Sequence, residues 1–484
     1  MRYLLPLLFA ASLALYDGSM TSAVAQPLSL EDAFAHALRH NRNLLAAEEN
    51  VRQADLQRRQ AWTIMGPTVD AQASHSWQNE ITSPLPGADP TAPALIIPPI
   101  DGECPLPDDG IPDDMALPTD PLQPGPACVY TQMAEQEIVV RPSRSATFQL
   151  SANQPLFVGA LIPALQAAAN QRRLARHNLD DAREQVLYNV ANLYFNTVAA
   201  QEFVALQEQS RDNLQAHLDI AETRFEVGET PRMGVLQASI ELRRAEAALT
   251  RARNDERNAR AALANLIGME DLPPLQSAAE LVADVQLPDF PDDPLEEARR
   301  HRSDLLAART QVDLARDNRN STWWQFSPSI FASGNVQRQT DPGAFGDEDT
   351  WTVMLMLNVP LIDRGSRIVS LQESQSQIRQ AEILRRATSE EVRLELQTTQ
   401  SQIEVTRQNL GVAHEQVELA EENFEITTLS FEHGLATSLD VIDANQALLS
   451  AHVNLIQEQF NLQLDTFNYF RAMGLLLEHV SQER

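Results

Sequence analysis

The sequence predicts a mainly helical chain that also carries a small β-sheet part and is built from two copies of one unit. Long stretches lack Gly and Pro and repeat apolar residues every seven positions, which is typical of coiled-coil helices. Two pairs of segments alternate apolar and polar side chains, as half-buried strands do. One turn motif recurs at a fixed offset, because Phe225 and Phe431 are 206 residues apart and so are Gly228 and Gly434. This offset indicates internal duplication.

Composition excludes several classes of function. The 484 residues include 67 Asp and Glu against 37 Lys and Arg, and the resulting net charge of −30 would repel nucleic acid. The 10 histidines are scattered without the spacing of metal ligands. No catalytic triad or glycine-rich phosphate loop stands out in the sequence, so we expect no enzyme activity, no cofactor and no metal site.

Residues 1–25 have the pattern of a signal peptide. An apolar run, Leu4–Leu15, precedes Ala23-Val24-Ala25, which fits a cleavage site. The mature chain would then begin at Gln26, where a lipid anchor is not indicated. No later apolar run reaches 18 residues, so we expect no transmembrane helix. An exported chain of this kind is either soluble or a β-barrel.

The two predicted units are residues 26–289 and 290–484. Each begins with a short helix marked by Leu-Glu-x-Ala, at Leu30 and at Leu295. A strand, a loop, a second strand and a long helical hairpin follow in both units. The predicted strands are 67–77, 146–153, 328–336 and 351–359, and the predicted hairpins are 159–268 and 365–474.

The loop between the strands differs between the two units. Residues 83–142 hold 14 of the 28 prolines and show no periodicity, so we expect a long surface loop. The equivalent loop, 338–350, is short. Cys104 and Cys128 both lie in the long loop, and an even number of cysteines in an exported chain favours a disulfide bond between them.

Each helical hairpin turns at a glycine. Residues 164–227 contain neither Gly nor Pro, and Gly228 then ends the helix, as Gly434 does in the second unit. Thr230 and Thr437 are the expected N-caps of the two return helices. The seven-residue repeat of the long helices predicts that they pack as coiled coils.

Four strands in one chain are too few to close a barrel, since known single-chain barrels start at about eight strands. An open sheet edge in lipid would leave backbone groups without hydrogen-bond partners. The chain must therefore associate with copies of itself. A dimer with eight strands and a trimer with twelve both satisfy this requirement.

The ordered motifs resemble those of the TolC family of outer-membrane efflux channels, from Leu28 to Leu476. The resemblance is carried by the two Leu-Glu-x-Ala starts, Gln154–Gly159, the two Phe-x-x-Gly turns and Asp440–Ala444. It implies a homotrimer whose twelve-stranded β-barrel sits in the outer membrane and continues into a twelve-helix periplasmic α-barrel. Such a protein is not an enzyme. It is the channel of a tripartite efflux or type I secretion system, and it passes compounds or proteins from a periplasmic adaptor and an inner-membrane pump to the outside.

The resemblance also assigns roles at the helical turns. Asp440 and Asp443 would line the constriction as rings of carboxylates, although acids in a first helical turn also stabilise the helix itself. The residues that would contact the adaptor are Gly228, Glu229, Thr230, Gly434, Leu435 and Ala436. Family members tie the closed gate with Tyr, Arg and Asp, whereas this chain has Phe431, Ala436 and Gly234 at those positions. Closure must therefore rest on other contacts.

A soluble periplasmic coiled-coil adaptor or scaffold without a channel is the alternative function. It requires the alternating segments to be soluble strands. The two functions differ in membrane partitioning, because a β-barrel presents an apolar band to lipid and needs detergent for extraction.

Overall fold

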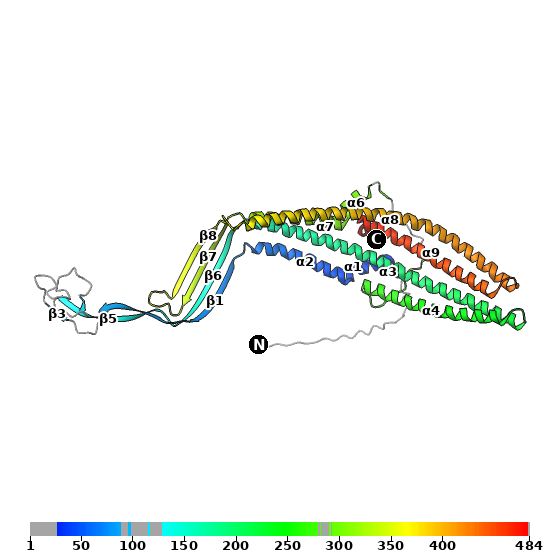
Figure 1. Cartoon of the computed structure of the whole chain (residues 1–484), viewed down its shortest axis with the longest axis horizontal. Helices are drawn as coiled ribbons and strands as arrows, with labels where there is room; N and C mark the ends of the chain where they lie inside the picture. Colours follow the sequence, from blue (N-terminus) through cyan, green and yellow to red (C-terminus); the bar gives the residue numbers. More distant parts are fainter. Residues whose placement is uncertain are drawn as a thin grey trace, which may run out of the picture. The chain divides into compact units, whose positions relative to one another are not determined.

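The computed structural model describes residues 27–88, 95–97, 115–116, 128–278, 281, 290–291 and 293–482. The chain divides into two compact units (Figure 1). The helical unit holds Met1–Gln57, Ala167–Arg316 and Gln375–Arg484, and the sheet unit holds Arg58–Gln166 and Asp317–Ser374. The predicted signal peptide and Cys104 lie outside the described residues, so the Cys104–Cys128 disulfide stays a prediction.

The long helices form two hairpins, as the sequence predicts. Helices α3 and α8 contain 66 and 67 residues, and each is followed by a return helix of 36 residues. The helices are α1 (Leu30–His40), α2 (Arg42–Thr63), α3 (Leu161–Glu226), α4 (Arg232–Ile267), α6 (Pro294–His301), α7 (Ser303–Trp324), α8 (Ser366–Glu432), α9 (Ser438–Met473) and α10 (Leu476–Gln482). Among the described residues, no helix combines the length and the apolar character needed to cross a membrane.

The main core of the helical unit joins α1, α3 and α9. Phe34 of α1 and Phe195 of α3 both pack on Phe467 of α9, with ring centroids 6.0 and 5.9 Å apart. The buried Tyr194 hydroxyl donates a hydrogen bond of 2.7 Å to the carbonyl of Leu28. Burial of such rings is worth several kcal/mol in total, roughly 1.5–3 kcal/mol for each large side chain. The N-terminal helix is therefore fastened to both hairpins.

The seven-residue apolar repeat of α8 faces the protein, which confirms the coiled-coil prediction. Leu396, Ile403, Val417 and Phe431 recur at spacings of seven or fourteen, and all are buried. Leu396 and Ile403 share one cluster with Tyr469 of the return helix α9. The repeat thus pairs the two helices of the second hairpin.

A partly buried network of charged side chains ties α7, α8 and α9 together. Arg302, just before α7, forms ion pairs with Asp304 at 2.9 Å and with Glu395 of α8 at 2.5 Å. Arg471 of α9 pairs with the same Glu395 at 2.7 Å. Burial raises the pKa of the nearby Glu184 of α3 to about 8, so this side chain carries a proton at neutral pH and adds no charge to the network.

The sheet unit contains the four predicted strands as one antiparallel sheet. They are β1 (Thr68–Trp77), β6 (Arg144–Val158), β7 (Ser329–Gln339) and β8 (Asp349–Asn358), in the order β1-β6-β7-β8. Strand β6 runs past Pro155, where the sequence predicts its end, because the register shifts between Pro155 and Phe157. A bulge of this kind accommodates proline within a ladder.

The alternation of side chains gives this sheet two unlike faces. One row on the apolar face is Ala71, Leu150, Val336 and Trp351. The next row, on the opposite face, is Gln72, Gln149, Gln337 and Thr350. Leu150, Val336 and Trp351 are exposed although apolar, at 49%, 56% and 75%. An apolar face of this kind requires an apolar environment.

The prediction that residues 83–142 form a structureless loop is wrong for part of that segment. Strand β2 (Ile81–Ala88) pairs antiparallel with β5 (Cys128–Arg141), and the short β3 (Leu95–Ile97) and β4 (Met115–Ala116) also pair with β5. Strand β2 was not predicted because it contains Pro84 and Pro86, and prolines normally indicate a loop. They are two residues apart, so both missing N–H groups fall on the same side of an edge strand, where no ladder bond is needed.

Candidate functional site

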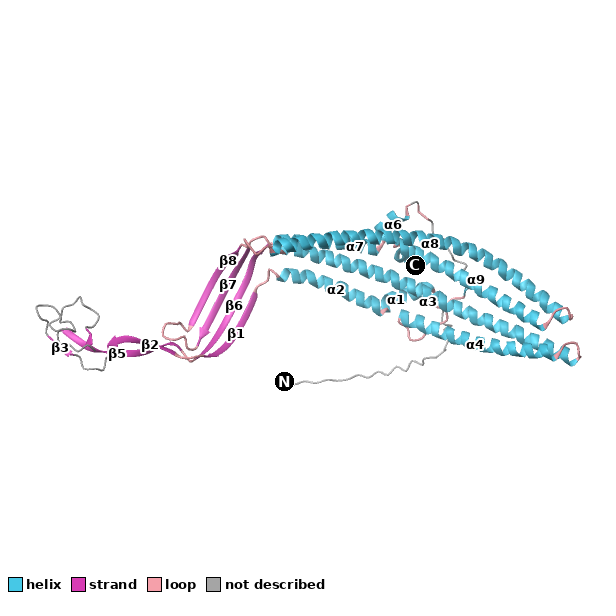
Figure 2. Ribbon diagram, in the orientation of Figure 1, coloured by secondary structure: helices cyan, strands magenta, loops and turns pink. Residues whose placement is uncertain are grey.

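The turns of the two helical hairpins lie at the same end of the helical unit (Figure 2). Gly228 and Gly434 adopt left-handed backbone angles, with φ of 81° and 79°. After each glycine an N–H returns to the preceding helix, from Glu229 to the carbonyl of Arg224 at 2.9 Å and from Leu435 to that of Ser430 at 2.8 Å. Both glycines therefore end their helices as predicted, in the C-capping geometry that favours glycine.

The starts of the return helices differ from each other. Thr437 caps α9 as predicted and forms a reciprocal capping box with Asp440, whose carboxylate accepts the Thr437 N–H at 2.7 Å. Thr230 is not an N-cap, which corrects the prediction for α4. Pro231 holds that position, with an extended ψ of 151° and no side-chain hydrogen bond, so the helix begins only at Arg232.

The two candidate constriction residues lie on the first turns of α9. Asp440 and Asp443 are both exposed and are three residues apart, so they share one helix face. Hydrogen bonds from the backbone N–H and the hydroxyl of Thr437 hold the pKa of Asp440 below its usual range. Asp440 is thus a capping residue, whatever its role in a channel. Asp443 takes no part in the cap.

The six candidate adaptor-contacting residues lie in the two turns, and most are open to solvent. Gly228, Glu229, Gly434 and Leu435 are exposed, whereas Thr230 and Ala436 are half-buried. The exposed surface is also apolar, because the side chains of Val227 and Leu435 are 67% and 84% exposed. Contiguous exposed apolar patches mark interaction sites, whereas single exposed aliphatic side chains are common on protein surfaces.

Arg224, which the sequence analysis missed, joins the two turns. Its guanidinium donates a hydrogen bond to the carbonyl of Phe431 at the end of α8. It also lies 5.3 Å from the centroid of the Phe431 ring and pairs with Glu229 at 3.4 Å. A cation at the C-terminus of a helix is favourable by roughly 0.3–1 kcal/mol. The available signal was that Arg224 is the basic residue in the last turn of α3.

His217 makes a second link between the hairpins. Its Nε2 lies 2.8 Å from the Ser438 hydroxyl, and that hydroxyl donates to the Gly234 carbonyl at 3.3 Å. The imidazole also packs against Phe431, with ring centroids 4.7 Å apart. Gly234 and Phe431 therefore both take part in contacts between the hairpins, through a main-chain carbonyl and an aromatic ring.

Further along α3, a buried amide continues this polar contact line. Asn445 of α9 donates to Ser210 at 2.8 Å and accepts from Asn213 at 3.0 Å. Ser210 and Asn445 are both buried, so these bonds satisfy groups that would otherwise be costly to desolvate. We call Ser210, Asn213, His217 and Arg224 the α3 polar stripe. The stripe connects α3 to the turn and return helix of the second hairpin.

The geometry predicts that acid loosens this end of the helical unit. Burial lowers the pKa of His217 from 6.5, and its Nδ1 atom is buried without a hydrogen-bond partner. The neutral ring is thus favoured, and its stabilising contribution is present in full above about pH 6.5 and is lost as the pH falls towards the lowered pKa. Hydrogen exchange of residues 438–445, corrected for the intrinsic effect of pH, should accelerate below about pH 6.5.

The matched variants are His217→Gln and His414→Gln. The His217→Gln side chain keeps a donor for Ser438 but does not change its charge with pH, so the acceleration should vanish. His414 is exposed on α8, and its replacement should leave the acceleration intact. An unchanged pH response in His217→Gln would contradict this account.

Comparison with known proteins agrees with the fold. The family model described as outer membrane efflux protein matches residues 130–269 and 295–474. Outer membrane efflux protein BepC of Brucella suis is 25% identical over 335 residues, which are 68% of this chain and 72% of BepC. Outer membrane protein TolC of Vibrio cholerae is 24% identical over 339 residues, 67% of this chain and 76% of TolC. The CusC structure superposes with a TM-score of 0.70 at 16% identity and covers 98% of this chain and 99% of CusC. The chain therefore belongs to the outer membrane efflux protein family.

Proposed function

We propose that this outer-membrane protein is the exit channel of a tripartite efflux or type I secretion system and that it works as a homotrimer. The observation that carries the proposal is the four-stranded sheet, which has one mostly apolar face, one mostly polar face and two edges that no strand of the described residues pairs with. Its apolar face suits lipid and its polar face suits a water-filled lumen. Successive side chains of each strand point to opposite faces, as they do in the strands of transmembrane β-barrels.

Three copies would supply twelve strands and leave no edge. The order β1-β6-β7-β8 places β1 and β8 at the edges, so β8 of one copy would pair with β1 of the next. Two copies would give the eight strands of the smallest barrels. We favour three copies because the family resemblance implies a trimer.

The turns of the helical hairpins are the proposed docking surface for a periplasmic adaptor, which in turn recruits an inner-membrane pump. The exposed apolar side chains of Val227 and Leu435 support this role, because apolar surface at a turn gains free energy when a partner covers it. The protein then acts by conducting cargo, either small compounds or proteins, rather than by catalysis.

The soluble adaptor or scaffold is disfavoured by the sheet. A soluble strand pair would cover its apolar face, but here Val353 is 75% exposed and Leu355 70% exposed on β8. Planar-bilayer recording of the detergent-purified protein tests the proposed function directly. Discrete conductance steps are expected, and a folded, detergent-soluble protein that never conducts would refute it.

Arginine scanning of β8 gives a matched test of which face meets lipid. Val353 lies on the apolar face, and its neighbour Thr352 lies on the polar face. Val353→Arg should destabilise the inserted sheet by roughly 2–4 kcal/mol if it lies near the bilayer midplane, whereas Thr352→Arg should cost little because its side chain reaches water. The fraction of each variant recovered in the outer membrane is the measurement. Equal recovery of the two variants would favour the soluble alternative.

The constriction role of Asp440 and Asp443 is tested best with Asn. Asp440→Asn keeps an acceptor for the Thr437 N–H, whereas Asp440→Ala would remove that acceptor and weaken the cap. If the carboxylates form rings, the Asp440→Asn, Asp443→Asn double variant should lose cation preference and relieve block by a trivalent cation in single-channel recordings. Glu432→Gln, at an exposed acid at the end of α8, is the control. A double variant that behaves like this control would leave the two acids as helix-start residues only.

A further inference from the structure

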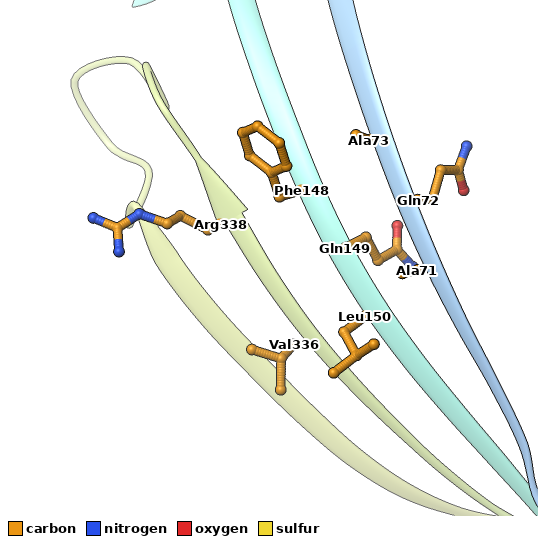
Figure 3. Close-up of a pocket in the computed structure, with 8 residues that line it drawn as sticks. All are labelled: Ala71, Gln72, Ala73, Phe148, Gln149, Leu150, Val336 and Arg338. Carbon is orange, nitrogen blue, oxygen red and sulfur yellow. The ribbon is translucent and has the colours of Figure 1, made fainter. Parts of the chain in front are cut away.

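We propose that the apolar face of the sheet holds a binding site for an anionic lipid of the outer leaflet, with the acyl chain in a groove and a phosphate on Arg338. Figure 3 shows the groove and the side chains that line it. The inference rests on the proposed function in one respect, because it takes this face to be the one in contact with lipid.

The groove arises from the side chains that the register brings together. It has a volume of about 400 Å³, and six of the eight residues that line it belong to the apolar face, namely Ala71, Ala73, Phe148, Leu150, Val336 and Arg338, while Gln72 and Gln149 complete the lining. Ala71 stands opposite Leu150, and Ala73 stands opposite Phe148. Two small side chains beside two large ones leave a hollow along the strands. Its apolar walls match a hydrocarbon chain, which gains free energy by burying its surface there.

Arg338 supplies a cation at one end of the groove. It aligns with Phe148 on one side and with Asp349 on the other. Its ion pair with Asp349 is 3.7 Å long, and the two side chains are 65% and 67% exposed. An exposed pair of this kind contributes little to stability, so it yields readily to a phosphate that approaches from the membrane. Arginine is also the side chain best suited to bind phosphate through two parallel hydrogen bonds.

The position of Arg338 along the strands fits the headgroup level. The opposite ends of β6 and β8 lead into α3 and α8, which form the periplasmic part, so Arg338 lies towards the outer end of the sheet. Trp77 and Trp351, on the same face, are 72% and 75% exposed. Exposed tryptophans on the lipid face mark the boundary between hydrocarbon and headgroups. The lipid that offers a phosphate on this side of an outer membrane is its phosphorylated glycolipid.

A second cation lies on the same face. Arg144 is exposed and lies four residues from Phe148 along β6, a separation of about 13 Å at the rise of a strand. Arg144 and Arg338 could therefore meet two phosphates of one headgroup. The groove itself lies over β1, β6 and β7, so pairing of the edges of β1 and β8 with other copies leaves this face open.

The test is native mass spectrometry of the detergent-purified protein titrated with purified outer-membrane glycolipid and with the same lipid after enzymatic removal of its phosphates. The phosphorylated lipid should bind at least about tenfold more tightly, since a charge-assisted hydrogen bond contributes roughly 1.5–3 kcal/mol. Arg338→Gln should reduce this preference strongly, and only the part due to Arg144 should remain. Ala73→Phe, which fills the groove, should weaken binding of both lipids.

Arg379→Gln is the matched control, because Arg379 is an exposed arginine of α8 outside the sheet. It should bind both lipids like the unmodified protein. Equal binding of the two lipids, or a full preference in Arg338→Gln, would overturn the site. Bilayer conductance measured on the same preparations separates this result from the proposed function, because Arg338→Gln should still conduct.

Discussion

The unpaired edges of the four-stranded sheet are the constraint on which the rest of the molecule depends. Among the described residues, each strand of this sheet is paired with its neighbour, with one register shift in β6, but β1 and β8 each have one side without a partner strand. The backbone N–H and C=O groups along an unpaired edge can form hydrogen bonds with water in a soluble protein. Hydrocarbon offers no such partner, and each backbone group left without a hydrogen bond then costs several kcal/mol. The apolar face rules out water as the surroundings on that side. Pairing with further copies gives the edge strands hydrogen-bond partners while the apolar face stays in contact with lipid, which is why we propose a closed assembly.

The α3 polar stripe holds the first hairpin to the turn and return helix of the second hairpin. The Arg224 guanidinium donates a hydrogen bond to the main-chain carbonyl of Phe431. The Ser438 hydroxyl contacts His217 and donates a hydrogen bond to the main-chain carbonyl of Gly234. A carbonyl is present whatever side chain a position carries. These two hydrogen bonds therefore do not depend on the side chains at positions 431 and 234. The link also includes a histidine, whose charge changes between about pH 5 and pH 8. A link between arginine and aspartate would keep its charges over that range.

The periodicity of apolar residues predicted the four strands and the long helices. It missed features that depend on contacts with residues far away in the sequence. The four strands and the α8 stripe of Leu396 and Ile403 follow from spacings of two and seven, which are local properties. Strand β2 was missed because prolines normally indicate a loop, and only its edge position makes them acceptable. The contact of Arg224 with Phe431 joins residues 207 positions apart, so no local pattern contains it. The lipid groove depends on the register of three strands, which the sequence leaves open.

The number of chains in the detergent-purified protein tests the central claim most directly. Native mass spectrometry under conditions that preserve the β-sheet signal should give a mass of three chains, the number that the family resemblance implies, with twelve strands and no edge unpaired. The complex should survive dilution, because its separation would expose backbone groups to the detergent interior. A stable folded single chain in detergent would contradict the account, and a stable dimer would replace the twelve-stranded barrel with one of eight strands.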